Sequence, residues 1–177
     1  SPYGIFYHRQ KKAKFVPSSL WQDQTPIDWL IRSFSENLWI HPAGWLVSRK
    51  LTEKAGPWDE RLSMDDDGEY FARIITQSEE VVFVNEARCY YRKSGYRQLS
   101  RNLTERALDS LVLSMKLKIR CLMSLEDSDR TRRACVDLLQ TSLPFFYPEK
   151  TETLRQMNVL ALELGGRLEP PKLDGLS

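Results

Sequence analysis

The chain has 177 residues and a net charge of +2, from 26 Lys and Arg against 24 Asp and Glu. This length suits one domain, or a small α/β unit with a helical appendage, and excludes two domains of ordinary size. Hydrophobic residues make up 41% and charged residues 28%, which excludes a collagen-like chain and a disordered one.

The cysteines and the hydropathy pattern indicate the cellular compartment of the protein. Three widely spaced cysteines with no C-x-x-C pair argue against a disulfide framework and against a zinc site. No apolar run approaches the roughly 18 to 20 residues of a membrane-spanning helix. These features predict a cytoplasmic protein, with peripheral association at the inner face of the membrane as an alternative. Because the sequence starts at Ser1 without an initiator methionine, we interpret it as a piece of a longer polypeptide.

The first half of the chain predicts strands alternating with helices. Residues 3–8 favour a buried strand, and Thr25 as N-cap before Pro26 predicts a helix over residues 26–36. Apolar residues 38–40 and 45–47 flank a Pro/Gly turn, as in a strand interrupted at a ligand. Residues 49–55 predict a short helix that ends at Gly56. Helical spacing predicts a helix over residues 66–76, and two strands joined by a turn are expected at 81–84 and 88–92.

The second half of the chain predicts helices only. Apolar stripes run from residue 108 to 122 and from 154 to 164, and a third helix around 134–139 is expected to break near Pro144. The glycines at 165 and 166 predict the end of the last helix. We therefore predict three regions: an α/β unit over residues 1–100, a helical extension over 101–168 and a flexible tail over 169–177.

The charge is unevenly distributed along the chain. Residues 90–133 contain eleven Lys or Arg and five Asp or Glu. A basic stretch of this kind attracts phosphate-bearing ligands, nucleic acid or an anionic membrane, and it is also typical of a solvated helix face. No helix-turn-helix, zinc or aromatic-platform signature accompanies the charge, so we do not expect a nucleic-acid partner.

An acidic run, Asp65-Asp66-Asp67, precedes the helix expected at 66–76. Local chemistry offers a structural explanation, in which Asp66 caps the helix with Glu69 in the first turn, or Ser63 caps it with Asp66. A carboxylate at a helix N-terminus is also held rigidly and favoured in its ionised form, which suits a general base. The run on its own is therefore compatible with both a cap and a catalytic group.

The residues around this run resemble family 2 glycosyltransferases. The segment from Gly56 to Ile74 reads GPWDERLSMDDDGEYFARI, with a glycine, an aromatic residue and an Asp-Glu pair before an acidic doublet that opens a helix ending in arginine. Residues 42–49, 82–86 and 90–92 are similar to the family's neighbouring landmarks, in the same order. The resemblance covers about a third of the chain and implies a GT-A fold, of which this chain would be the acceptor-side half.

The resemblance implies transfer of a sugar from a nucleotide-sugar donor to a sugar or glycolipid acceptor, with inversion, in polysaccharide or glycoconjugate synthesis. One base takes the acceptor proton in such a reaction. The family places it at Asp67, with Asp66 at the preceding position. Mg²⁺ or Mn²⁺ is expected for the intact enzyme. In the family an Asp-x-Asp motif at the end of an apolar strand binds this cation. Neither Asp65-x-Asp67 nor Asp127-Ser-Asp129 follows an apolar strand, so no metal ligands are expected in this chain, and we expect Asp127-Ser-Asp129 to be a turn or N-cap. This chain alone is therefore expected to be inactive.

Further candidate substrate-binding residues come from the same resemblance. Trp45 and Trp58 are candidates to stack on a sugar or to pack in the core. Asp59 and Glu60 are candidates to bind acceptor hydroxyls or to cap a turn. The small residues Ala43 and Gly44 stand where the family brings its backbone close to the donor sugar. Arg92 and Arg97 follow the last strand, where they would contact the diphosphate or be surface charge. His41 and His8 are expected to be structural.

A rival interpretation treats the chain as a non-catalytic interaction module. In this reading the basic helices bind a partner protein or a membrane surface, and the α/β part has no activity. Lys116 and Arg120 fall on one helix face, which is also the ordinary arrangement of a solvated surface. The sequence predicts neither the sugar nor the oligomeric state.

Overall fold

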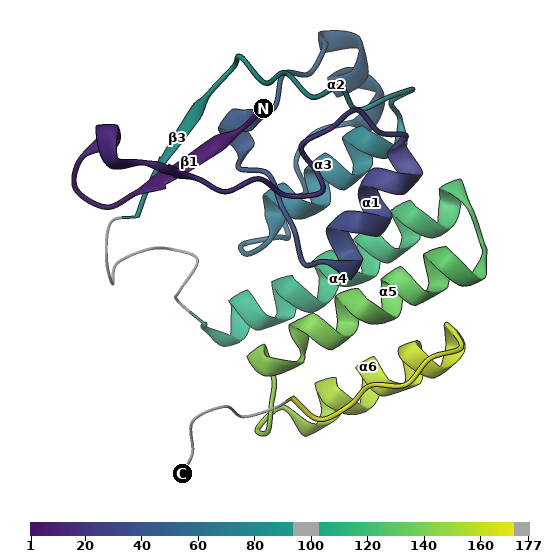
Figure 1. The fold of residues 1–177 in the computed structure, drawn as a ribbon. Coiled ribbons are helices and arrows are strands. Elements are labelled where there is room, and N and C mark those ends of the chain that lie inside the picture. Colours follow the sequence, from purple (N-terminus) through teal and green to yellow (C-terminus); the bar gives the residue numbers. More distant parts are fainter. Residues whose placement is uncertain (94–102, 172–177) are drawn as a thin grey trace.

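The computed structural model describes residues 1–93 and 103–171 and shows a mixed α/β fold (Figure 1). Six α-helices and a three-stranded sheet make up the described part of the chain. The sheet lies at one side of the molecule, and the last three helices form a layer below the helices α1 and α3 (Figure 1). The α/β prediction is therefore confirmed at this coarse level.

The sheet has the strand order β2-β1-β3. β1 (Tyr3–Phe6) pairs antiparallel with β2 (Lys14–Phe15) and parallel with β3 (Cys89–Arg92). Parallel neighbours need a long crossover connection, and here α1, α2 and α3 all lie between the two strands along the chain. The strands expected at residues 3–8 and 88–92 are thus confirmed in slightly shorter form.

The strand expected at residues 81–84 is wrong. Among the described residues only Val81 pairs, in an isolated bridge with Gln24, and the exposed Val82 and Val84 have no partner strand there. Residues 38–40 and 45–47 are not strands either, and a 3-10 turn (Pro42–Gly44) lies between them. Local β-propensity was present in each segment, but pairing is decided by tertiary contacts, and β3 pairs with β1 instead of forming a hairpin.

The helices of the first half begin and end close to where their caps predict. α1 (Pro26–Ser35) starts after Thr25, whose hydroxyl accepts the N–H of Asp28 at 3.2 Å. α2 (Arg49–Ala55) ends at Gly56, which has a φ of 83° that favours glycine. α3 (Asp66–Thr76) follows the acidic run. Local capping signals thus locate these three helices correctly.

The second half forms the helical layer. α4 (Glu105–Leu125) and α5 (Asp129–Ser142) are joined by a short turn, and α5 starts at Ser128, as one reading of the Asp127–Asp129 segment predicted. The break expected near Pro144 is a 3-10 turn (Leu143–Phe145). α6 (Thr151–Glu163) is followed by Gly165 with a φ of 82°. The three expected helices are therefore confirmed.

One hydrophobic core joins the two halves of the chain. Its fully buried members come from α1, α3, α4, α5 and α6 and include Leu30, Ile75, Leu122, Leu139 and Ala161. α3 packs on α4, and α1 packs on α5. The predicted helical extension therefore shares its core with the α/β part, and the boundary predicted at residue 100 stays a prediction.

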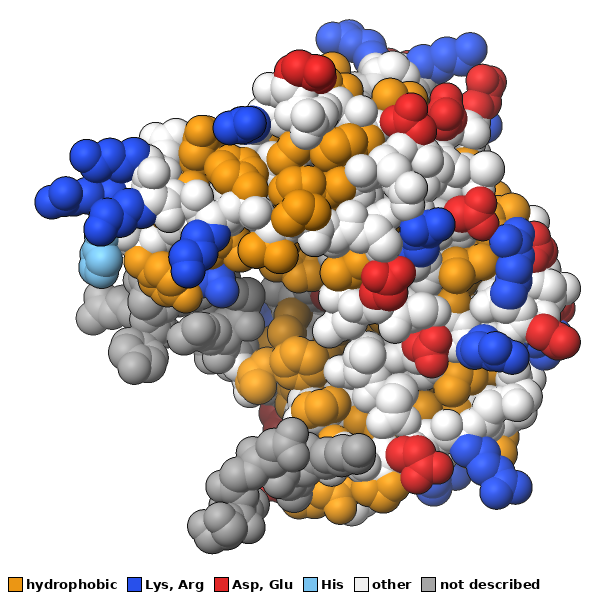
Figure 2. Space-filling view, viewed as in Figure 1, with side chains coloured by type: hydrophobic (Ala, Val, Ile, Leu, Met, Phe, Trp, Pro, Cys, Tyr) orange, Lys and Arg blue, Asp and Glu red, His pale blue; other side chains and the backbone are white. Residues whose placement is uncertain are grey.

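The surface carries mixed charge with one basic projection. Figure 2 shows Lys and Arg side chains gathered at the tip of the sheet, over the turn between β1 and β2, whereas both charge signs are interspersed on the helical face. The exposed basic residues of this turn include Arg9, Lys11 and Lys12. Within the described ranges, none of the helices combines the length and hydropathy needed to cross a membrane.

Candidate functional site

The acidic run is at the start of α3, but its capping differs from the prediction. Asp65, and not Asp66, is the N-cap, and it adopts a left-handed conformation with φ 57° and ψ 27°. Its side chain makes no bond to the helix N–H groups. The capping box expected between Asp66 and Glu69 is therefore wrong. The reason is that the Asp65 carboxylate turns towards α4, where it finds stronger partners.

Three side chains on one face of α4 hold the loop before α3. The Ser110 hydroxyl accepts the backbone N–H groups of Ser63 and Met64 at 2.8 and 2.9 Å. The Ser114 hydroxyl lies 2.6 Å from Asp65 Oδ2, and the Lys118 ammonium forms an ion pair with the same oxygen. Ser110 and Ser114 are buried. No local motif marks these three residues in the sequence, but positions 110, 114 and 118 share one face of a helix, which was the available signal.

Gly68 is required by this arrangement. A Cβ added at Gly68 would lie 2.1 Å from Asp65 Oδ1, closer than any side chain could tolerate. Glycine in the first turn of a helix is otherwise unfavourable. The absence of a side chain at Gly68 therefore lets the Asp65 carboxylate lie over the first turn of α3, next to Asp66 and Asp67.

The Asp67 side chain is partly buried, and its surroundings oppose ionisation. Burial raises the pKa of Asp67 above its ordinary value, and the negative charges of Asp65 and Asp66 raise it further. The N–H of Gly68, which donates to Asp67 Oδ1 at 2.9 Å, and the charge of Lys118 act in the opposite direction. Burial thus outweighs the preference for the ionised form that we expected from the helix N-terminus. A carboxylate of raised pKa is a stronger base.

His41 is expected from the sequence to be structural, but its ring lies within electrostatic range of Asp67. Burial lowers the pKa of His41, whereas the negative charge of Asp67 raises it, so the two groups are electrostatically coupled. His41 Nδ1 accepts the N–H of Ala43 at 3.2 Å. The neutral ring therefore carries its proton on Nε2. His41 thereby caps the turn Pro42–Gly44.

His41 packs against one end of a row of aromatic rings from the sheet and the preceding loop. Its ring lies 4.7 Å from that of Tyr91 in β3. Trp39 packs edge-on against Tyr91 and stacks on Tyr3, with ring centroids 5.4 Å apart. The Trp39 side chain is 50% exposed. A row of aromatic rings thus leads from the surface to His41, and an isolated tryptophan in a short apolar segment offered no sequence signal for it.

The two tryptophans selected from the sequence have packing partners. Trp45 stacks on Phe71 at 4.9 Å and meets Trp29 edge-on, and its Nε1 donates to the Ile40 carbonyl. Trp58 stacks on Tyr70 with ring centroids 4.3 Å apart and is 41% exposed. Trp45 therefore packs within the fold, whereas Trp58 covers α3 with one face and keeps part of its surface accessible.

The Asp-Glu pair after Trp58 lies in an exposed turn. Arg61 donates to both carboxylate oxygens of Asp59, at distances from 2.6 to 3.2 Å, and this hydrogen bonding lowers the pKa of Asp59 to about 2. Glu60 is exposed. Arg73 in α3 donates to the carbonyl of Pro57 and pairs with the buried Glu69, which fastens the loop to the helix. The turn is therefore well positioned, but the Asp59 carboxylate is already engaged.

The remaining predicted residues are placed as follows. Ala43 is exposed, and Gly44 is partly buried, where an added Cβ would lie 2.8 Å from Ile40 Cγ2. Arg92 is exposed at the end of β3 and points to the face opposite its neighbour Tyr91, as alternation in a strand requires. Arg97 lies outside the described residues.

Among residues 1–93 and 103–171, no group of three or more His, Cys, Asp or Glu side chains could hold a metal ion. The Asp65 carboxylate is already bound to Ser114 and Lys118, so the acidic run does not fit a Mg²⁺ or Mn²⁺ site. Comparisons with family models, curated proteins and solved structures found no match to this chain.

Proposed function

We propose that this chain forms the acceptor side of an inverting glycosyltransferase of the GT-A fold, with Asp67 as the general base. The observation that carries the proposal is the environment of Asp67, a partly buried carboxylate of raised pKa at the start of α3 with one oxygen free of hydrogen bonds among the described residues. Groups with such perturbed pKa values cluster at functional sites. The parallel pairing of β1 with β3 around a helical crossover is compatible with the expected fold.

The proposed reaction is a single displacement. Asp67 takes the proton of an acceptor hydroxyl, the oxygen forms a bond to the anomeric carbon, and the bond to the nucleoside diphosphate breaks with the electron pair leaving on the phosphate. Asp67 Oδ1 accepts the N–H of Gly68, and Oδ2 has no hydrogen-bond partner within the described residues. We assign the proton transfer to Oδ2 for this reason.

The donor and its divalent cation have no assigned residues in this proposal. Mg²⁺ or Mn²⁺ would neutralise the leaving diphosphate when bound. The acidic run does not provide its ligands, so the proposal expects other residues of the intact enzyme to hold the nucleotide sugar and the cation.

The acceptor sugar is assigned to the row of aromatic rings next to His41. Aromatic faces complement the apolar C–H faces of pyranoses, and Trp39 is half exposed, whereas Trp45 is packed between Phe71 and Trp29. Trp39 therefore replaces Trp45 as the residue proposed to stack on the acceptor.

Nucleotide release tests the proposal. The natural polypeptide that contains this sequence is incubated with nucleotide sugars, Mg²⁺ or Mn²⁺ and mono- or oligosaccharide acceptors. We expect Asp67→Asn to lower kcat by about 10² to 10⁴, the usual contribution of a general base. Trp39→Ala is expected to raise KM for the acceptor with a smaller change in kcat. The matched control is Asp109→Asn, the same change at an exposed carboxylate of α4.

Two results would contradict the proposal. Turnover by Asp67→Asn at the rate of the Asp109→Asn control would exclude Asp67 as the base. The absence of release of any nucleotide with every donor would exclude the glycosyltransferase assignment itself.

A further inference from the structure

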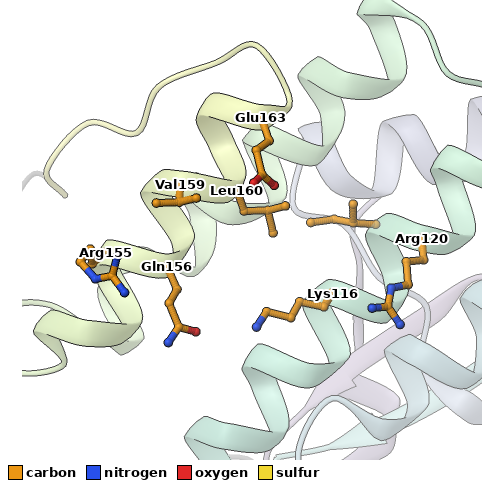
Figure 3. Close-up of a pocket in the computed structure, with 8 residues that line it drawn as sticks. Lys116, Arg120, Arg155, Gln156, Val159, Leu160 and Glu163 are labelled. Carbon is orange, nitrogen blue, oxygen red and sulfur yellow. The ribbon is translucent and has the colours of Figure 1, made fainter.

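A groove of about 420 Å³ lies between α4 and α6, far along the chain from the acidic run (Figure 3). Its volume is within the range of protein binding clefts. The floor is apolar and the rim is mostly charged. The buried Ile119 and the partly buried Leu160 form the floor, and the rim consists of the exposed Val159 with Lys116, Arg120, Arg155, Gln156 and Glu163.

The groove exists because the helical layer has a gap above α5. α5 packs against α4 on one side and against α6 on the other. A smaller hollow, lined also by Lys116, Gln156 and Leu160, reaches down to Leu139 of α5 and to Met115 of α4. The bottom of the groove is therefore continuous with the hydrophobic core, and the wall residues recur at helical spacing on both α4 and α6.

The rim is basic, and few of its positive charges are paired with acidic side chains of the described residues. Lys116 and Arg120 are exposed, lie one turn apart on α4 and form no ion pair with any described residue. Arg155 pairs with Glu152, outside the lining. Glu163 is the only acidic residue of the lining. The face of Lys116 and Arg120, which the sequence analysis compared with a solvated surface, is thus one wall of a groove.

We propose that this groove binds an acidic amphipathic helix of a partner protein. Its apolar residues would cover Ile119 and Val159, and its carboxylates would pair with Lys116 and Arg120. Docking of an amphipathic helix between two others is a recurrent recognition mode, and both walls already have the spacing that such packing needs. The proposal is independent of the glycosyltransferase assignment.

The shape of the groove favours a helix over a membrane surface. Lys116 and Gln156 point towards one another across the space between α4 and α6 (Figure 3). A flat anionic bilayer instead requires apolar and basic side chains that project outward together. Ile119 is only 6% exposed and lies at the bottom of the groove, where a bilayer does not reach.

Fluorescence anisotropy on the full chain tests the proposal. The probe is a labelled helical peptide with Leu at the i, i+3, i+4 and i+7 positions, Glu on both flanks and Ala elsewhere. We expect micromolar binding, and the double change Lys116→Glu and Arg120→Glu should weaken it by about tenfold or more. Arg106→Glu, at an exposed site of α4 outside the lining, is the matched control and should bind like the wild type.

A gain-of-affinity variant separates binding from folding. Glu163→Gln removes the only acidic side chain of the lining and should tighten binding by about twofold to threefold. The same peptide with Lys in place of Glu should not bind. Thermal unfolding of each variant verifies that the fold is retained.

Three outcomes would overturn the proposal. The first is no binding of the acidic peptide up to roughly 1 mM. The second is equal binding by the charge-reversal variant and the Arg106→Glu control. The third is capture of the chain by phosphatidylserine vesicles, dependent on Lys116 and Arg120, without binding of the peptide, which would assign the groove to lipid.

Discussion

At Asp67 the requirements of stability and of the proposed chemistry conflict. Because the folded-state pKa of Asp67 is raised, the folded protein holds this proton more tightly than the unfolded chain does. The resulting stabilisation is complete below the unfolded pKa of about 3.9 and is lost as the pH rises through the folded pKa. At neutral pH the ionised carboxylate is therefore a destabilising group in the fold, which is typical of a functional residue.

Replacement of Asp67 by a neutral residue should remove the destabilisation that its ionised carboxylate causes at neutral pH. We expect Asp67→Asn to be more stable than the wild type at pH 7, and the difference should disappear at about pH 3, where Asp67 is protonated in both states. Urea unfolding at the two pH values measures the effect. Asp109→Asn, at an exposed site, should show no such pH dependence. A variant Asp67→Asn that is less stable than the wild type at pH 7 would mean that the carboxylate contributes to the fold.

The sequence was informative about Asp67 but not about its neighbours. The motif around Asp67 is local and could be recognised in the printed order of residues. The contacts of Asp65 with Ser114 and Lys118 join positions about fifty residues apart, and local patterns contain no information on such pairs. The exposure of a tryptophan side chain could not be predicted from the sequence either. Trp45 was therefore chosen as a candidate to stack on a sugar, whereas the more accessible Trp39 was not.

At the scale of elements, α4 is a support for the loop before α3. Ser110, Ser114 and Lys118 satisfy backbone and carboxylate groups that would otherwise be left without partners in a partly buried loop. They also stabilise the left-handed conformation of Asp65, which is uncommon for a residue other than glycine. The position of the acidic run thus depends on a helix that contains none of its residues.

Removal of this support should affect both stability and ionisation. We expect Lys118→Met to destabilise the fold by about 2 kcal/mol, because it leaves the Asp65 carboxylate without its cation. It should also raise the pKa of Asp67 further, since Lys118 lowers it. Chemical denaturation and NMR titration of the carboxyl carbons measure the two effects. Lys116→Met, at an exposed lysine of the same helix, is the control, and equal behaviour of both variants would contradict the role of Lys118.

The helices could be predicted and the sheet only in part. Capping residues such as Thr25 and Gly56 and the period of apolar residues act within a few positions, so all six helices were located from the sequence. The prediction of a strand at residues 81–84 is wrong, because the local sequence pattern does not determine which edge of the sheet is available for pairing. The GT-A fold stays a prediction for the same reason, since it depends on strand order.

At the scale of the molecule, one hydrophobic core contains residues from both sides of the boundary predicted at residue 100. Leu30 and Phe34 of α1 and Ile75 of α3 lie in one cluster with residues of α4 and α5. Burial of each such side chain contributes about 2 kcal/mol, and a domain retains only about 5–15 kcal/mol in total. Loss of the helical layer would therefore remove more stabilising free energy than the whole free energy of unfolding of a typical domain, and the α/β part would not stay folded.

Truncation tests this dependence. We expect a polypeptide of residues 1–102 to lack a cooperative thermal transition, because the faces of α1 and α3 that meet α4 and α5 are left bare. Addition of residues 103–177 as a separate polypeptide should restore the transition. Circular dichroism follows both experiments. A sharp transition for residues 1–102 alone would establish two independent folding units.

The parallel pairing of β1 with β3 has a consequence for synthesis on the ribosome. β1 can pair early with the nearby β2, but its other edge waits for residues 89–92, which leave the ribosome much later. At about 5–20 residues per second, this edge is unpaired for several seconds in every newly made chain. An open strand edge readily recruits another chain. The nascent polypeptide is therefore most exposed to aggregation before β3 emerges, a period in which a chaperone would protect it.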